Sequence, residues 1–373
     1  MWIEEVKTYL VNANVLQSAD RPRGRNWLFA KVSTYEGVDG IGEGSGWPEV
    51  VEKGIQEVAE SLYREEPFHT ERIWQKLYRM LHAHGLTGTV RGGVISALDM
   101  ALWDIKGKQL ELPIHTLLGG KIHNRIRIYG HANSVKEARV LVEKGYTAFK
   151  CGPDVETLAE LREEFGYGID IGVHCHGEFS VAEALSLADD IRPYKPVFLE
   201  EPTNPDDLEA LRWLGQRARV PLAAGERLFS KWSFRELFET RAIAIAQPEI
   251  TRIGGITEAK KVATLCEAFG VMLAPHDGST GPIAEMANLH VLATTPATLF
   301  LEHRDRDVFW RREVVDGVIL DQDGHLAVPD KPGLGLTLNE ESIEKYPAAP
   351  YSRYRYTYED EIAVNRRRKG VDG

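Results

Sequence analysis

The sequence predicts an α/β protein in which a parallel βα-barrel follows a smaller α+β domain. From about residue 125 onward, eight short apolar runs alternate with amphipathic helical runs, which is the pattern of a βα-barrel. Before about residue 120, strand and helix patterns do not alternate in this way. The chain has 373 residues, more than one hydrophobic core usually supports, so we expect separate domains.

The α+β domain, residues 1–122, is expected to contain a small antiparallel sheet. Phe29–Ser33 and Gly40–Gly44 flank a turn at Tyr35–Gly37 and are predicted to form a hairpin. Three helical stretches follow, at Glu49–Arg64, His69–His82 and Arg91–Leu110. The third has apolar residues at helical spacing and ends near Pro113.

The barrel, residues 123–310, is built from the eight apolar runs, each of which is a predicted strand. These strands are Arg127–Gly130, Ala148–Lys150, Ile169–His174, Val197–Glu200, Leu222–Glu226, Ala242–Gln247, Val271–Pro275 and Leu299–Glu302. Helical segments between them include Val181–Ile191, Asp206–Arg217, Lys231–Thr240 and Gly255–Phe269. An open doubly wound sheet is the alternative, and it is disfavoured because no GxGxxG turn follows a strand.

The last segment, residues 311–373, changes character again. Gly317–Pro329 has a turn-rich hairpin pattern, and we expect it to return to the sheet of the first domain. The tail from Tyr351 is rich in Tyr and Arg, and its basic cluster Arg366–Lys369 is predicted to be a solvated terminus.

Composition excludes several classes of protein. The net charge of −11 argues against a nucleic-acid partner, and no apolar stretch is long enough to cross a membrane. The N-terminus lacks the pattern of a signal peptide, so we expect a cytoplasmic protein. Three cysteines without a CxxC pair argue against a disulfide framework and against a cysteine zinc site.

Ionisable residues end seven successive predicted strands. They are Lys150, His174, Glu200, Glu226, Glu249, His276 and Glu302, and their spacings of 24, 26, 26, 23, 27 and 26 are close to one βα repeat. In a parallel barrel these positions converge at one end, where such enzymes place their chemistry. Each residue alone is more often a loop charge or a satisfied polar group. Seven together would repel or desolvate one another unless a cation or substrate satisfied them.

Residue types suggest the chemistry of this end of the barrel. Glu200 and Glu226 are hard oxygen donors on neighbouring strands, which suits Mg²⁺ or Mn²⁺, and His174 ends the preceding strand. On the far side, Glu249 next to His276 would fix the imidazole tautomer and give a general base.

A second histidine pattern suggests an acid opposite this base. His174 and His176 are two residues apart, so both point to the same face of a regular strand. His176 could then stand opposite His276 as a general acid. A metal, a base and an opposed acid suit proton abstraction beside a carboxylate, with the metal holding the enediolate.

Specific motifs surround these residues. They are Phe198-Leu-Glu-Glu-Pro202, Gly225-Glu-Arg227, Pro248-Glu-Ile-Thr-Arg-Ile-Gly-Gly255, Ala274-Pro-His276 and Phe300-Leu-Glu302. With them, nearly the whole chain resembles the enolase superfamily in its mandelate racemase subgroup. Three further stretches, Tyr129–Asn133, Ala224–Glu236 and Pro332–Leu336, resemble the galactonate and mannonate dehydratases.

The resemblance implies a fold and a set of roles. The fold would be a modified TIM-like (β/α)7β barrel under an α+β capping domain that the C-terminal segment completes. Mg²⁺ would be held at His174, Glu200 and Glu226, and Glu249 with His276 would form the base dyad. His176 would protonate a departing hydroxyl, and Glu302 would contact the substrate carboxylate or enediolate.

Three departures from the family pattern matter. His174 replaces an aspartate, which should weaken Mg²⁺ and favour Mn²⁺, Fe²⁺, Ni²⁺ or Zn²⁺. Glu249 replaces the usual aspartate of the dyad. Lys150 is followed by Cys151 and Gly152, so the second lysine of the Lys-x-Lys pair found in the family's racemases is absent. That absence disfavours racemisation and favours dehydration, which needs one base and one acid.

We therefore expect a metal-dependent hydro-lyase, a sugar-acid dehydratase that converts an aldonate to a 2-keto-3-deoxy acid through a metal-stabilised enediolate. The alternatives are a cycloisomerase or epimerase on the same fold, and a non-catalytic relative with an impaired metal site. Lys150 is expected to be catalytic together with His276, Glu249 and His176. Substrate contacts are expected from Arg227 and from His131, for which a structural role is the alternative. Trp47 and Arg21–Arg25 are candidates for a lid, with an ordinary surface loop as the alternative. A symmetric homo-oligomer, from dimer to octamer, is also expected.

Overall fold

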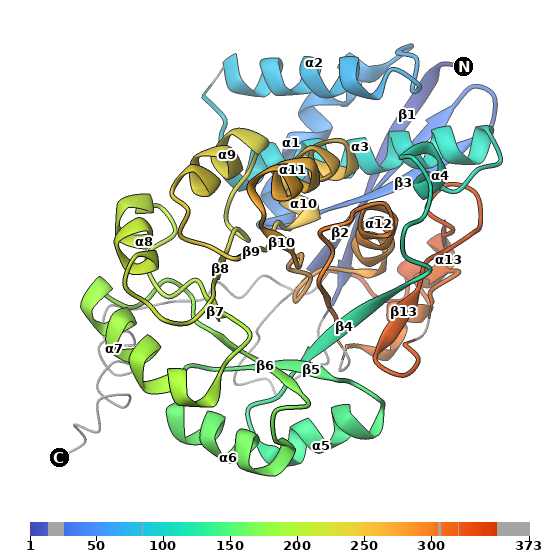
Figure 1. Cartoon of the computed structure of the whole chain (residues 1–373). Helices are drawn as coiled ribbons and strands as arrows, with labels where there is room; N and C mark the ends of the chain where they lie inside the picture. Colours follow the sequence, from blue (N-terminus) through green and yellow to red (C-terminus); the bar gives the residue numbers. More distant parts are fainter. Residues whose placement is uncertain (14–25, 84, 305–306, 320, 349–373) are drawn as a thin grey trace.

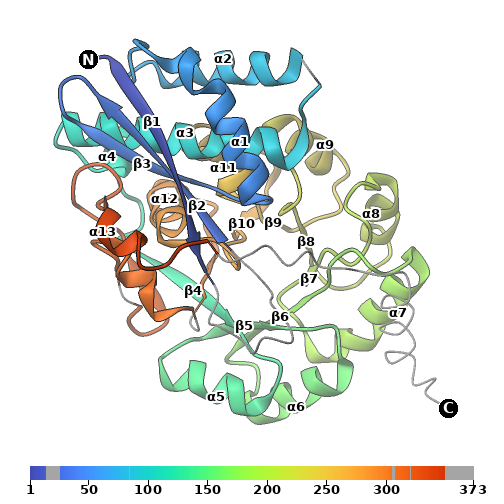
Figure 2. The same cartoon turned by 180° about the vertical axis from the view of Figure 1, so that it is seen from behind.

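The computed structural model of the chain describes residues 1–13, 26–83, 85–304, 307–319 and 321–348. Its two main parts are a three-stranded antiparallel sheet with helices and a curled sheet of parallel strands ringed by helices (Figure 1). The view from behind shows the antiparallel sheet lying along one side of the barrel (Figure 2). The predicted fold class is therefore confirmed.

The capping domain consists of one small sheet and three main helices. Its antiparallel strands, in the order β1-β2-β3, are β1 (Ile3–Asn12), β2 (Asn26–Thr34) and β3 (Asp39–Gly44). Its helices are α1 (Pro48–Ala59), α2 (Thr70–Ala83) and α3 (Gly88–Gln109). The predicted hairpin and the three helices are confirmed, whereas β1 had not been predicted as a strand.

Both faces of β2 are covered by apolar groups. Leu28, Ala30 and Val32 pack with the helices of the capping domain, and Trp27 and Phe29 belong to the apolar core of the barrel. This alternation follows from the two-residue period of a strand. The capping sheet is thus held between its own helices and the barrel.

Eight parallel strands form the barrel, and all eight lie where the apolar runs predicted them. They are β4 (Arg125–His131), β5 (Ala148–Cys151), β6 (Asp170–His174), β7 (Leu199–Glu200), β8 (Leu222–Ala224), β9 (Ile245–Ala246), β10 (Met272–Leu273) and β11 (Leu301–Glu302). Neighbours pair in the order β10-β9-β8-β7-β6-β5-β4-β11. A parallel bridge between Leu273 and Thr298 joins the two ends of this series, so the ring closes.

Helices alternate with these strands around the outside. They are α5 (Val135–Glu143), α6 (Val155–Phe165), α7 (Val181–Ile191), α8 (Leu208–Gly215), α9 (Lys231–Glu239), α11 (Gly255–Phe269) and α12 (Pro282–Ala293), with short turns α4 (Ile114–Leu117) and α10 (Ile250–Ile253). Side-chain caps start several of them; Ser180 and Glu183 form a capping box at α7. None of the described helices is long and apolar enough to span a membrane.

The C-terminal segment corrects one prediction. The stretch Gly317–Pro329 does not return to the capping sheet, because β13 (His325–Ala327) pairs antiparallel with β4 of the barrel. The segment also contains η3 (Phe309–Arg312), β12 (Val315–Asp316), β14 (Thr337–Leu338) and α13 (Glu340–Ile343). It reaches the capping domain elsewhere, where Tyr9 Oη donates to Glu340 at 2.6 Å. The basic cluster Arg366–Lys369 lies outside the described residues.

The capping domain and the barrel are in close contact along α3. A Cβ added to Gly92 of α3 would lie 1.7 Å from the carbonyl oxygen of Arg252 in α10, so only glycine permits this approach. Nearby, Ser96 Oγ accepts the amides of Gly254 and Gly255 at 2.9 and 3.0 Å. This junction holds the start of α11, and with it the chain after β9, in a fixed place.

Candidate active site

Polar side chains from all eight barrel strands meet at the carboxyl end of the barrel, which we call the mouth. They are His131 (β4), Lys150 (β5), His174 (β6), Glu200 (β7), Glu226 (after β8), Glu249 (after β9), His276 (after β10) and Glu302 (β11). The contacts described below link these eight side chains into one network. The structure thus brings together the seven strand-end residues of the sequence pattern, and His131 with them.

The imidazole of His276 lies between two carboxylates. Its Nδ1 is 2.8 Å from Glu249 Oε2, and its Nε2 is 3.1 Å from Glu226 Oε2. Burial opposes the protonated form, but the charges of Glu226, Glu302 and Glu249 outweigh it and raise the pKa of His276 to about 10. With Nδ1 held by Glu249, the Nε2 edge of the ring is the one that faces Glu226.

Lys150 is almost fully buried between two other carboxylates. Its Nζ is 2.8 Å from Glu200 Oε1 and 3.1 Å from Glu302 Oε1. Although burial disfavours the ammonium form, these two carboxylates raise the pKa of Lys150 well above its ordinary value. Lys150 is therefore a fixed positive charge at the floor of the mouth.

Glu302 is fully buried and is surrounded by donors. His131 Nε2 lies 2.5 Å from its Oε1, and the Asp277 amide donates to its Oε2 at 3.0 Å. Burial alone would raise the pKa of Glu302, but Lys150, His276 and His131 hold it well below the ordinary value. The Glu302 carboxylate is thus ionised.

The two histidines after β6 lie side by side. The rings of His174 and His176 are 4.9 Å apart, and His174 also contacts His131 at 5.8 Å. Burial, followed by the charges of Lys150, His131 and His176, lowers the pKa of His174 to about 2, so its imidazole is neutral. His176 is exposed to solvent. Their common face agrees with the two-residue spacing.

The guanidinium of Arg227 makes ion pairs and a hydrogen bond with other residues of the mouth. Its guanidinium is 2.8 Å from Glu201 Oε2 and 3.5 Å from Glu226 Oε1, and it donates to the His176 carbonyl at 3.0 Å. These contacts tie the loop after β6 to the loop after β8. A direct contact of Arg227 with substrate stays a prediction.

Two residues of the mouth were not identified from the sequence. Glu201 has a left-handed backbone with φ 40°, and burial together with the charge of Glu226 raises its pKa to about 8. Gln247 donates from Nε2 to Glu200 Oε2 at 2.5 Å, and its buried Oε1 has no hydrogen-bond partner among the described residues. The second acid of the Phe198–Pro202 motif was the only sequence feature pointing to Glu201, and none pointed to Gln247.

The mouth carries the donor types of a cation site, but they are not assembled into one. Among the residues that the structure describes, no three His, Cys, Asp or Glu side chains are arranged to hold a metal. Lys150 pairs with Glu200, and His276 pairs with Glu226. Burial is the largest cause of the raised pKa of Glu201, and the nearby carboxylates of Glu226 and Glu200 add to it. Two carboxylates, a neutral imidazole and an unpartnered amide oxygen therefore fit a divalent cation in their chemistry.

The expected lid is described only in part. Trp47, 47% exposed, immediately precedes α1 in the loop after β3. Arg21–Arg25 lie outside the described residues. A substrate contact by either segment stays a prediction.

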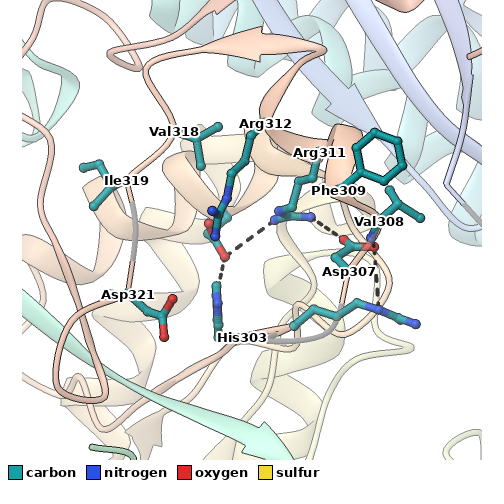
Figure 3. Close-up of a pocket in the computed structure, with 11 residues that line it drawn as sticks. His303, Asp307, Val308, Phe309, Arg311, Arg312, Val318, Ile319 and Asp321 are labelled. Atoms are coloured by element: carbon teal, nitrogen blue, oxygen red, sulfur yellow. Dashed lines mark hydrogen bonds and ion pairs between the residues drawn. The ribbon is translucent and has the colours of Figure 1, made fainter. Parts of the chain in front are cut away.

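A cavity of about 170 Å³ is lined by Glu285 and by residues between His303 and Asp321 (Figure 3). Its charged groups pair with one another: His303 is 2.6 Å from Glu285, and Arg311 is 2.9 Å from Asp307. Since neither His276 nor Glu249 lines this cavity, we place the chemistry at the mouth.

Comparison with known proteins identifies relatives over most of the chain. Residues 16–119 match the family described as mandelate racemase / muconate lactonizing enzyme, N-terminal domain, and residues 133–342 match the family described as enolase C-terminal domain-like. A D-galactonate dehydratase of Pectobacterium atrosepticum is 35% identical over 355 residues, which are 87% of this chain and 92% of that protein. One of Cronobacter sakazakii is 34% identical and covers 85% of this chain and 90% of its own.

Solved structures of other proteins have a similar fold over most of this chain. The 3,6-anhydro-D-galactonate cycloisomerase of Zobellia galactanivorans has a TM-score of 0.85 at 31% identity, covering 93% of this chain and 99% of that chain. An enolase of Pantoea ananatis with bound D-gluconate and Mg has a TM-score of 0.84 at 28% identity, covering 93% of this chain and 95% of that chain.

Proposed function

The chain belongs to the mandelate racemase and muconate lactonizing enzyme family of the enolase superfamily, and we propose that it is a sugar-acid dehydratase. It removes the C2 proton of an aldonate and eliminates the 3-hydroxyl, which yields a 2-keto-3-deoxy acid. The pair of His276 and Glu249, with Nε2 facing the mouth, is the observation that carries this proposal. The similarity to D-galactonate dehydratases supports it.

His276 is the base in this proposal. Its Nε2 takes the C2 proton, the C–H bonding electrons move toward the carboxylate, and an enediolate forms. Glu249 holds Nδ1 and stabilises the imidazolium that results. Lys150 is buried between Glu200 and Glu302, and its positive charge holds these two carboxylates in place at this end of the barrel.

His176 is the acid that completes the elimination. As the C2–C3 double bond forms, the C3–O bond breaks and His176 gives its proton to the departing hydroxyl, which leaves as water. The enol that remains takes up a proton at C3 and becomes the 2-keto acid. The exposure of His176 suits a group that must exchange protons with solvent between turnovers.

The proposed reaction requires a divalent cation at the mouth. His174, Glu200 and Glu226 would hold it, and when bound it would supply Lewis-acid stabilisation of the enediolate charge. A base must be neutral before it takes a proton, so the charge of Glu226 that raises the pKa of His276 has to be neutralised. We propose Mg²⁺ or, because His174 is a softer donor, Mn²⁺ or another transition metal.

A panel of aldonates and aldarates tests the proposal. Purified protein loaded with Mg²⁺ or Mn²⁺ is incubated with each acid, and 2-keto acid is detected with semicarbazide. We expect one or a few aldonates to be converted, and none to be converted by His276→Asn. A folded, metal-loaded protein that converts no member of the panel would overturn the proposal.

Cycloisomerisation is the second candidate, because the cycloisomerase from Zobellia galactanivorans has a similar fold over nearly its whole chain. The same C2 deprotonation would break a C3–O bond that belongs to an anhydro ring, so the ring opens and no water is released. Mass spectrometry separates the two reactions. Dehydration lowers the mass by one water, whereas the cycloisomerase product has the mass of its substrate.

A further inference from the structure

A chain of buried hydrogen bonds leads from the capping domain to the base dyad. Glu249 Oε1, the oxygen that does not face His276, lies 2.8 Å from Thr251 Oγ1 and 3.2 Å from the Thr251 amide. Thr251 Oγ1 is 2.5 Å from Ser45 Oγ, which belongs to the loop after β3 of the capping domain. Arg252 Nε donates to the same Ser45 Oγ at 3.1 Å.

The chemistry of the groups fixes the direction of this chain. The hydroxyl of Thr251 donates its single proton to Glu249 Oε1. Thr251 Oγ1 must then accept from Ser45, and Ser45 Oγ accepts in turn from Arg252. The hydroxyls of Ser45 and Thr251 therefore each donate one hydrogen bond and accept another. Each bond in this series strengthens the next, so the Thr251 hydroxyl becomes a stronger donor to Glu249.

Because these hydrogen bonds are buried, they can fix the orientation of the Glu249 carboxylate. Glu249 and Thr251 are fully buried and Ser45 is nearly so, which leaves water little access to Glu249 Oε1. The glutamate side chain has several rotatable bonds, so the Glu249 carboxylate needs a second anchor to stay aligned with His276. Among the described residues, the Thr251 amide and hydroxyl provide that anchor.

We propose that Thr251 and Ser45 are positioning residues of the base dyad, through which the capping domain takes part in proton abstraction. The proposal rests on the proposed function of His276 as the base. Both act by holding Glu249 so that its other oxygen stays 2.8 Å from His276 Nδ1.

The test compares hydroxyl removal at Thr251 with hydroxyl removal elsewhere on the same junction. Thr251→Val keeps the shape and loses the bond to Glu249, whereas Thr251→Ser keeps the hydroxyl. Thr257→Val is the matched control, because Thr257 Oγ1 accepts from Trp103 Nε1 at 2.8 Å across the same two domains without contacting the dyad.

Kinetics are measured on the sugar acid that the panel shows to be converted fastest. We expect Thr251→Val to lower kcat by about 10- to 100-fold, the usual effect of losing a hydrogen bond to a charged group, with little change in KM. Thr251→Ser should keep most of the activity, and Thr257→Val should equal the parent. Ser45→Ala should lower kcat by a few-fold, and should cause no further loss in a Thr251→Val background.

A second measurement does not depend on turnover. The Nδ1 proton of His276, hydrogen-bonded to a carboxylate, is expected as a downfield proton NMR resonance that is absent from His276→Asn. It should shift or broaden in Thr251→Val and stay in place in Thr251→Ser and Thr257→Val. An unmoved resonance in folded Thr251→Val overturns the positioning role, as does equal kcat for Thr251→Val and Thr257→Val. Absence of turnover by the parent protein overturns the proposed function instead, and the resonance still decides the role of Thr251.

Discussion

The Nε2 atom of His131 lies 2.5 Å from Oε1 of Glu302, so a histidine–glutamate pair joins the first and the eighth barrel strands. On its other oxygen, the same carboxylate is 3.8 Å from Nε2 of His276. Glu302 thus lies between two histidines, and the mouth has a polar wall beside the base dyad. His131 is 40% exposed at its side chain, which leaves it accessible to a ligand.

His131→Leu is expected to weaken substrate binding. The change removes the donor to Glu302 and a polar group that faces the mouth, so KM should rise by about 10-fold while kcat changes by less than about three-fold. His131→Gln, which retains a donor at a similar reach, should recover part of the loss. Steady-state kinetics on the converted sugar acid decide this, and an unchanged KM in His131→Leu would assign His131 a structural role.

His276→Asn should stop proton exchange at C2 of the substrate. Without the imidazole there is no base at this position, so exchange with solvent deuterium should fall by about 10²- to 10⁴-fold in proton NMR. His303→Asn is the matched control, because His303 also follows a barrel strand but pairs with Glu285 outside the mouth. Exchange at the parental rate in His276→Asn would remove His276 as the base.

His174→Asp should change the metal preference. A carboxylate in place of the neutral imidazole adds a hard, charged donor beside Glu200 and Glu226, so affinity for Mg²⁺ should rise relative to Mn²⁺ by roughly 10-fold. Calorimetric titration of metal-free protein with each ion measures the ratio. The same ratio in parent and variant would place the metal away from residue 174.

The stability of the protein should fall on acidification because of His290, which is buried in α12. Burial lowers the pKa of His290 from 6.5 to about 3, and its Nδ1 accepts the His115 amide at 3.2 Å. Below pH 6.5 the unfolded chain binds a proton at this side chain and the native state does not, so stability present at neutral pH is lost as pH falls.

His290→Asn keeps an acceptor but cannot titrate. The neighbouring His115, Asp330 and Lys121 remain in both proteins. Between pH 7 and pH 5 the parent should lose about 2 kcal/mol more free energy of unfolding than the variant. Urea denaturation at the two pH values measures this difference, and parallel losses in both proteins would contradict the shifted pKa.

The strands of the barrel were predictable because each is an apolar run followed by a polar residue at a nearly constant interval. The same regularity found the strand-end residues of the mouth. Helix α12 was not among the helices named from the sequence, and since all twelve of its residues are buried it offers no amphipathic pattern. β13 was assigned to the wrong sheet, since a short strand carries no information about which edge it will join.

The finer parts of the site could not be predicted for a different reason. Thr251 and Ser45 are small hydroxyl residues that lie 206 positions apart in sequence, and only the packing of α3 on α10 brings them together. The engagement of Lys150 by both Glu200 and Glu302 likewise depends on where three strands lie around the ring. Sequence spacing gives the strand ends, and the folded geometry determines which of them pair.

The contact between Gly92 and the Arg252 carbonyl has a consequence for unfolding. No room exists there for even one added carbon, and the side chains of β2 enter the apolar core of the barrel. The two parts of the chain can neither slide nor separate without exposing that shared core. Calorimetry should therefore record a single cooperative heat-absorption peak, with the small α+β portion having no melting temperature of its own.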